Sequence, residues 1–239
     1  MSGWSAKRFW ATATAEACEG GSTVRLDARA LKTPAKAPLI VPTMELAQAI
    51  AAEWDAQTAK VDPTTMPLTR LANSALDKIT PQFAEVADMI ADYGGSDLLC
   101  YRATAPRELI TRQAAAWDPP LAWAASTLNA PLTVTSGVTH IAQPGQSLVT
   151  LSRRVHAASV FELAALHDLV AITGSLILGL AVTKGHLSAA KAWATSRLDE
   201  DWQVEHWGQD DLASQSEAAR HRALMDADRF FRLCRSQFT

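Results

Sequence analysis

The chain has 239 residues, of which 48% are hydrophobic and 20% charged, and its formal net charge is -3. This composition is typical of a folded globular protein with one or two hydrophobic cores. Because a protein that binds phosphates needs a surplus of Lys and Arg, the charge gives no reason to expect nucleic acid binding. The longest apolar stretch, residues 169–182, is shorter than a membrane span, so we expect no membrane insertion.

The three cysteines, Cys18, Cys100 and Cys234, are widely spaced along the chain. Such a sparse set matches neither a disulfide framework nor a zinc motif and indicates a reducing compartment. Residues 1–10 lack the apolar segment of a secretory signal. We therefore expect a cytoplasmic protein, for which the mitochondrial matrix would be the eukaryotic equivalent.

The first 42 residues are predicted to form a small antiparallel β domain. Strands are expected at residues 8–14, 22–26, 31–33 and 39–41, with a turn at Gly20 and Gly21. The prolines at positions 34, 38 and 42 fit strand ends and sheet edges, since proline cannot donate to a ladder.

A helical period begins after Thr43, which is a plausible N-cap, and the predicted helix ends near Gln57. The mainly helical remainder, residues 43–239, is predicted to contain a rigid connector, seven further helices and one strand. The connector is 61–67, a helix starts near residue 68, and helices follow at 80–93, 107–117, 119–128, 155–182, 188–207 and 212–233, with a strand at 132–141. The expected class is α+β, with domains 1–42 and 43–239.

Motifs for nucleotide, metal or cofactor chemistry are not found. The glycine pairs at 20–21 and 94–95 have neither Walker A nor dinucleotide-binding spacing, so no nucleotide is expected. The six histidines show no metal-ligand spacing, and we assign no metal site and no cofactor.

His167 and Asp168 are the strongest candidates for catalysis. Adjacent residues on a helix point about 100° apart, so we expect these two side chains not to meet, and the chain has no G-x-S-x-G nucleophile motif. We assign no catalytic residue and do not expect an enzyme. A hydrolase using His167 and a carboxylate is kept as the alternative.

The strongest local charge feature is an acidic cluster late in the chain, comprising Asp199, Glu200, Asp201, Glu205, Asp210 and Asp211. Charge runs are more often solvated surface than sites. Here Trp202 and Trp207 flank the acids, a composition suited to docking a basic partner surface. Trp54, between Glu53 and Asp55, fits either a core or an interface position. A general binding module for basic peptides is a further open hypothesis.

Seven unusual segments are distributed along nearly the whole chain. They are residues 24–34 (VRLDARALKTP), 52–57 (AEWDAQ), 62–73 (DPTTMPLTRLAN), 97–102 (DLLCYR), 161–168 (FELAALHD), 174–180 (GSLILGL) and 196–207 (SRLDEDWQVEHW). In these segments the chain resembles the assembly chaperones of the F1 part of ATP synthase, found in α-proteobacteria and mitochondria.

The resemblance implies a small β domain followed by a helical domain, without ATP binding or turnover. It also implies a partner, the free α subunit of F1-ATPase, whose interface would be shielded until the β subunit covers it. By the same resemblance, the tryptophan of the second segment and acids of the late helix are associated with activity. The candidate partner-binding residues are therefore Trp54, Glu200, Asp201, Trp202, Glu205 and Trp207.

Overall fold

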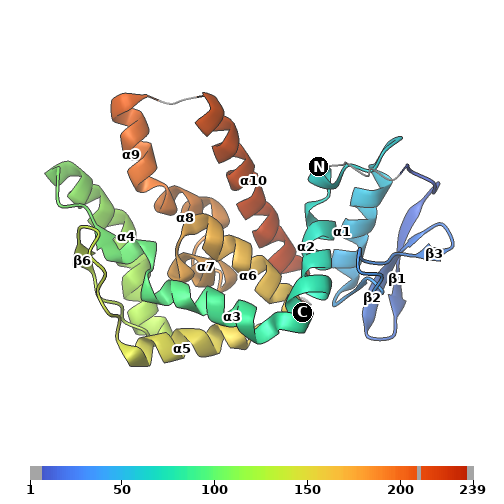
Figure 1. Cartoon of the computed structure of the whole chain (residues 1–239), viewed down its shortest axis with the longest axis horizontal. Coiled ribbons are helices and arrows are strands. Elements are labelled where there is room, and N and C mark those ends of the chain that lie inside the picture. Colours follow the sequence, from blue (N-terminus) through green and yellow to red (C-terminus); the bar gives the residue numbers. More distant parts are fainter. Residues whose placement is uncertain (1–6, 209–210, 236–239) are drawn as a thin grey trace. The chain divides into compact units, whose positions relative to one another are not determined.

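The computed structural model describes residues 7–208 and 211–235, with the side chains of 211–213 excepted. The chain forms two compact units (Figure 1). The first contains the described residues up to 83 together with 159–165 and 229–235, and the second contains 84–158 and 166–228. The α+β class is confirmed, because a small antiparallel sheet precedes a succession of helices.

The sheet of the first unit is centred on β2 (Gly21–Leu26). This strand pairs antiparallel with β1 (Ala13–Cys18), β3 (Arg29–Ala30) and β4 (Ile40–Val41). The predicted turn between β1 and β2 is confirmed, and a Cβ on Gly21 would lie 2.3 Å from the Val41 carbonyl oxygen. The strand predicted at 8–14 is wrong in extent, because the backbone N–H of Arg8 donates to Ala59 instead of to the sheet.

Helix α1 (Met44–Asp55) packs on β1 and β2 and buries Leu46 and Ile50. The predicted N-cap is confirmed, since the Thr43 hydroxyl accepts from the Leu46 N–H. Because α1 covers the sheet, the first unit extends well past residue 42. The expected domains 1–42 and 43–239 remain a prediction that differs from this division into compact units.

Short helical pieces follow α1 in an almost continuous run. In chain order they are a 3-10 turn at Pro63–Thr65, α2 (Pro67–Ser74), a π turn at Ala75–Ile79, a 3-10 turn at Thr80–Gln82, α3 (Phe83–Ala91), and 3-10 turns at Asp92–Gly95 and Leu98–Cys100. The helix predicted at 80–93 is thus present, although its ends are tighter than an α-helix.

The second unit contains α4 (Arg107–Leu128), where two helices broken at proline were predicted. That prediction is wrong, because α4 continues through Pro119 and Pro120. Its buried residues, Gln113, Trp117, Pro120, Leu121, Ala124 and Leu128, form one stripe at helical spacing on both sides of the prolines. Burial along this stripe offsets the ~3 kcal/mol that a proline typically costs inside a helix.

The single helix predicted at 155–182 is also wrong. The chain instead forms α5 (Gly145–His156), α6 (Val160–Thr173) and α7 (Leu176–Thr183). Gly174 adopts φ +68° between α6 and α7, and the Ser175 hydroxyl then caps α7 by accepting from the Leu178 N–H. Gly179 of α7 allows a close approach to α6, because a Cβ there would lie 2.6 Å from Val170 Cγ2.

Two further predictions are corrected in the second half of the chain. The strand predicted at 132–141 is reduced to β6 (Thr135–Ser136), which pairs parallel with β5 (Tyr101–Arg102). The helix predicted at 188–207 is divided into α8 (Ala189–Ser196) and α9 (Leu198–Trp207), before α10 (Asp211–Leu233). Within the second unit α9 packs against α4 and α8. Among the described residues, no helix is long and apolar enough to cross a membrane.

Candidate functional site

The candidate residues lie in two separate places. Trp54 belongs to α1 in the first unit, whereas Glu200, Asp201, Trp202, Glu205 and Trp207 all belong to α9 in the second. Asp210 of the acidic cluster lies outside the described residues, as does the side chain of Asp211.

Trp54 is half-buried and packs against a second tryptophan. Its ring meets that of Trp10 edge-on, with 5.2 Å between the ring centroids, and Trp10 is itself buried. The Trp54 indole N–H is buried without a hydrogen-bond partner. These contacts are those of a packing residue, and the interface role of Trp54 remains a prediction.

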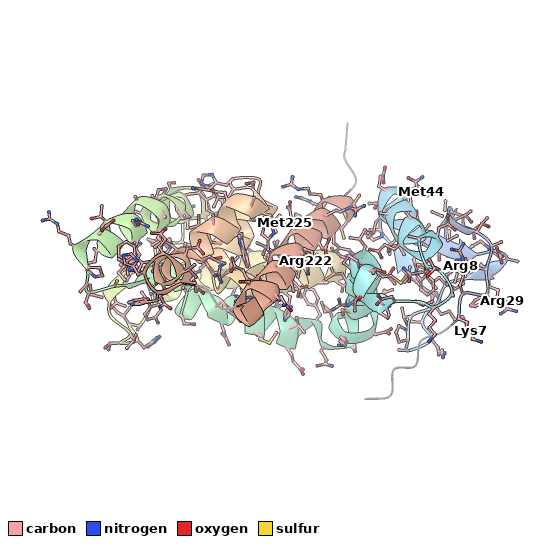
Figure 2. All side chains as sticks on the ribbon, turned by 90° about the horizontal axis from the view of Figure 1, so that it is seen from above. Lys7, Arg8, Arg29, Met44, Arg222 and Met225 are labelled. Atoms are coloured by element: carbon pink, nitrogen blue, oxygen red, sulfur yellow. The ribbon has the colours of Figure 1, made fainter. Side chains whose placement is uncertain are left out.

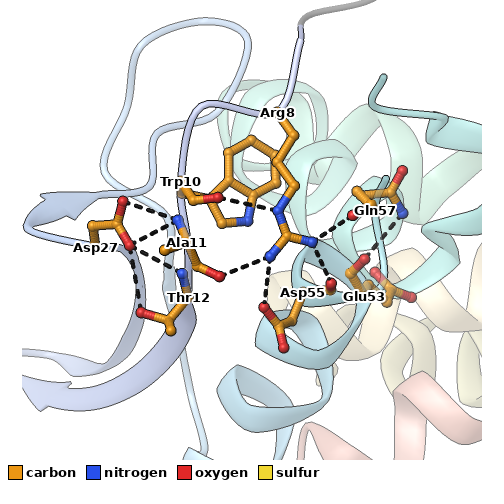
Figure 3. A network of polar contacts seen from close by, with 8 residues as sticks. All are labelled: Arg8, Trp10, Ala11, Thr12, Asp27, Glu53, Asp55 and Gln57. Carbon is orange, nitrogen blue, oxygen red and sulfur yellow. Dashed lines mark hydrogen bonds and ion pairs between the residues drawn. The ribbon is translucent and has the colours of Figure 1, made fainter. Parts of the chain in front are cut away.

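Arg8 fastens the segment before β1 to the end of α1 (Figure 3). Its guanidinium donates to the carbonyl oxygens of Trp10 at 3.1 Å and Asp55 at 2.7 Å, and forms an ion pair with the Asp55 carboxylate at 3.1 Å. It also lies over the Trp10 ring, 5.5 Å from the centroid. Figure 2 labels Arg8 with Lys7 and Arg29, two other cations of this unit. The Arg8 contacts keep Trp10 in place over Trp54.

Glu53, the neighbour of Trp54, caps α2. Its carboxylate accepts from the N–H groups of Leu68 and Thr69, each at 2.8 Å, and from the Thr69 hydroxyl at 2.7 Å. Burial nevertheless raises the pKa of Glu53. Gln57 is also buried and joins the end of α1 to the connector, because its side-chain oxygen accepts from the Asp62 N–H. Internal contacts therefore account for much of segment 52–57.

The N-terminal end of α9 is attached to α4 through a buried amide. The Gln113 side chain donates to the Asp199 carboxylate at 2.7 Å and accepts from the Ala103 N–H at 2.8 Å. One turn later on α4, the Trp117 indole N–H donates to the Thr195 carbonyl oxygen at 2.8 Å. Both α4 residues are fully buried, so the junction of α8 and α9 is fixed from the core.

Arg197, at this junction, gathers three carboxylates although it is only 8% exposed. Its guanidinium lies 3.5 Å from Asp201, 3.3 Å from Glu217 of α10 and 4.0 Å from Glu200. Burial raises the pKa of Asp201, Arg197 opposes that rise, and the Glu217 charge adds to it. Asp201 therefore serves an internal ion pair, and its presence on an exposed helix does not by itself make it a docking residue.

The middle of α9 rests on Arg112 of α4. Trp202 is buried, and the Arg112 guanidinium lies 4.6 Å from its ring centroid, at the distance of a cation–π contact. The same guanidinium pairs with Glu205 at 2.7 Å and with Glu108 at 3.3 Å. His206 stacks on Trp202 with 4.2 Å between centroids. Glu205 is thus neutralised by an internal partner.

Trp207 ends α9 and is 77% exposed, which is unusual for the largest apolar side chain. Gly208 follows with φ +83° and terminates the helix. Trp is enriched among residues that dominate protein interfaces. Trp207 is therefore the candidate whose geometry best suits direct contact with a partner.

An open groove of about 330 Å³ lies in the same unit. It is lined by Trp193, Ser214, Glu217, Ala218 and His221, from α8 and α10. The rings of Trp193 and His221 meet edge-on at 5.3 Å. The carboxylate of Glu217 makes the groove acidic on one side.

The expectation that His167 and Asp168 do not meet is wrong. His167 Nδ1 lies 2.9 Å from the Asp168 carboxylate, and both side chains are half-buried. This hydrogen bond raises the pKa of His167.

Burial raises the pKa of the Cys100 thiol to about 12, so this cysteine is poorly suited to act as a nucleophile. In the described part of the chain, no three His, Cys, Asp or Glu side chains are grouped to hold a metal.

Sequence reasoning missed the two arginines that organise α9. Arg197 could have been found, since Glu200 and Asp201 follow it at the i+3 and i+4 spacing of helical ion pairs. Arg112 could not, because 93 residues separate it from Glu205 and no local pattern marks it.

Comparison with known proteins gives consistent results for most of the chain. A family model described as ATP12 chaperone protein matches residues 7–125. The crystal structure of Atp12 from Paracoccus denitrificans is 51% identical, with 96% of this chain and 99% of that chain covered and a TM-score of 0.94. An Asp-to-Lys variant of that protein matches at 50% identity, 96% and 98% coverage and a TM-score of 0.94. The mitochondrial protein atp12 of Schizosaccharomyces pombe is 28% identical over 214 residues, 84% of this chain and 74% of that protein.

Proposed function

Because the chain belongs to the Atp12 chaperone family, we propose that it is an assembly chaperone for the F1 sector of ATP synthase. It binds the free α subunit and shields the subunit interface until the β subunit replaces it. The observation that carries the proposal is the 51% identity to P. denitrificans Atp12 across 96% of the chain. The proposal includes no catalytic step, no cofactor and no nucleotide, and it keeps the predicted cytoplasmic location.

The physical need for such a chaperone follows from obligate assembly. A subunit that is permanently covered in its complex exposes a large apolar interface when it is alone, and such a surface aggregates. The chaperone must cover this surface without competing too strongly with the final partner. A small contact anchored by a few side chains meets both demands, because a few residues supply most of the binding energy of an interface.

The end of α9 is the proposed contact, with Trp207 as its anchor. An exposed indole can insert into an apolar depression of the α subunit and still donate its N–H. The acids at the start of α9, Glu200 and Asp201, would then form a polar border near basic side chains of the partner. Trp202 contributes from beneath, as the buried support of the helix.

Co-purification tests the proposal directly. The α subunit is produced alone, with the wild-type chain, or with the Trp207→Ala variant, and its soluble, chaperone-bound fraction is measured by gel filtration. We expect a complex with the wild type, release of the chaperone when the β subunit is added, and at least about tenfold weaker binding by the variant. Lack of a complex between wild-type chain and α subunit, or equal binding to unrelated unfolded chains, would contradict the proposal.

A hydrolase using His167 and a carboxylate is the second candidate function. The observation that favours it is the 2.9 Å hydrogen bond between His167 and Asp168, which is how a general base is oriented in hydrolases. The matched test is His167→Ala. We expect this variant to bind the α subunit as the wild type does, and a measured esterase or peptidase activity that the substitution abolishes would favour the hydrolase instead.

A further inference from the structure

Helix α9 has a narrow attachment to the rest of its unit. Trp202 is its one buried residue within the described part of the chain, and the helix continues for five residues beyond it. The contacts at its N-terminal end, from Gln113 and Arg197, hold the junction with α8 and do not reach the far end. The direction in which Trp207 points therefore depends on what holds the last turn and a half.

Arg112 is placed to hold that part of the helix. Its planar guanidinium lies on Trp202 and reaches Glu205, which is three residues further along α9 and two residues before Trp207. At a rise of about 1.5 Å per residue, the Cα atoms of Glu205 and Trp207 are only about 3 Å apart along the helix axis, although their side chains leave nearly opposite faces of the helix. Glu108, one turn before Arg112 on α4, pairs with the other terminal nitrogen of the guanidinium, Nη2, at 3.3 Å.

From this geometry we propose that Arg112 and Glu205 form a clamp that positions Trp207 for the client protein. Both are positioning residues, and Glu205 acts through Arg112 and not by contacting the client. The inference rests on the proposed function and specifies how that contact surface is held. The client feature that this surface fits is an apolar depression that accepts one indole ring, since the clamp leaves Glu205 no unpaired charge with which to attract a basic side chain.

The clamp should influence binding much more than folding. Arg112 and Glu205 are 43% and 51% exposed, and exposed ion pairs contribute little to global stability because water and salt screen them. The same pair can still restrict the orientation of a helix end, and a rigid anchor loses less entropy on binding than a mobile one. A loss of affinity without a loss of thermal stability is therefore the signature of the clamp.

A charge swap separates positioning from direct contact. Arg112→Glu and Glu205→Arg each place two like charges in the clamp. Each should weaken binding to the α subunit about tenfold, which is a loss of ~1.4 kcal/mol in binding free energy. The double variant, Arg112→Glu with Glu205→Arg, restores opposite charges but not the contact with the Trp202 ring, so it should bind at least about threefold more tightly than either single variant without reaching wild-type affinity. Arg112→Lys, which keeps the charge but loses the planar stack and fork, should be intermediate.

Lys184→Glu is the matched control, because it changes the net charge as Arg112→Glu does at an exposed position at the end of α7. It should bind the α subunit like the wild type. Affinities are measured by titration, and melting temperatures are recorded for every variant. We expect the melting temperatures of both single variants to stay within about 2 °C of the wild type.

Recovery of binding in the double variant supports the clamp. A double variant as weak as the single ones would overturn it and would mean that Glu205 or Arg112 contacts the client itself. Single variants that bind normally, or that lose binding in proportion to a lowered melting temperature, would overturn it as well. If the wild-type chain does not bind the α subunit, the proposed function fails and the clamp falls with it, whereas failure of the swap alone leaves the proposed function intact.

Discussion

Replacing Asp97 with Asn should remove a pH dependence from the stability of the second unit. Asp97 is fully buried, and its two carboxylate oxygens accept from the Leu99 N–H at 3.1 Å and from the Ile177 N–H at 3.0 Å. It thereby ties the turn before β5 to the first turn of α7. Burial raises the pKa of Asp97 from 3.8 to about 6, although these hydrogen bonds oppose the rise.

The sign follows from proton linkage. Between pH 3.8 and about 6 the folded chain holds a proton on Asp97 that the unfolded chain has released. The stabilisation is therefore complete below pH 3.8 and is lost as the pH rises through about 6. A difference of about two pKa units corresponds to ~3 kcal/mol. Asp97→Asn cannot titrate and should lack this slope, while the other carboxylates contribute equally to both proteins.

Urea unfolding at several pH values measures the effect. We expect the free energy of unfolding of the wild type, minus that of the variant, to fall by up to ~3 kcal/mol between pH 4 and pH 7. Comparing the two proteins at each pH cancels the titration that they share. A difference that stays constant to within ~0.5 kcal/mol across this range would refute the reasoning, because it would mean that Asp97 is ionised throughout.

Three further substitutions test the packing that supports the candidate site. Glu53→Ala removes the cap of α2 and should lower the free energy of unfolding by ~2–4 kcal/mol in urea titrations, and a loss below ~1 kcal/mol would show that water replaces the carboxylate. Gly179→Ala should cost ~1–3 kcal/mol because its Cβ would overlap the Val170 side chain, and Val170→Ala in the same chain should recover part of the loss. Trp117→Phe keeps a buried aromatic ring but removes the indole N–H that donates to Thr195, together with part of the ring, so we expect its melting temperature to fall by several degrees, with an unchanged value counting against a contribution from that bond.

The local parts of this fold could be predicted from the sequence. Thr43 combines a hydroxyl with the start of a helical stripe, and the cap it forms is confirmed. The paired glycines at 20 and 21 also predict the turn between β1 and β2. The structure supplies the physical reason, since Gly21 lies against a neighbouring strand where a side chain would not fit. In both cases the signal is contained within a few consecutive residues.

The failures arise where tertiary packing decides. Pro119 and Pro120 predict a break, but the buried stripe of α4 runs through them, so burial outweighs the local penalty. The continuously apolar sequence of residues 155–182 predicts one helix. In the structure this segment is divided, because Gly174 adopts a left-handed conformation and Asp97, from another segment, accepts from the first turn of α7. The site shows the same limit, since the α9 acids were visible in the sequence but their arginine on α4 was not.

The exposure of Trp207 has a practical consequence for spectroscopy. The chain contains eight tryptophans, and among the described ones Trp10, Trp117 and Trp202 are buried whereas Trp207 faces water. Indole emission moves to longer wavelength as water gains access, so Trp207 should emit at longer wavelength than the three buried tryptophans. Iodide should quench that component first. Subtracting the spectrum of the Trp207→Ala variant would then isolate the signal of one side chain, giving an optical report on the end of α9 without any added dye.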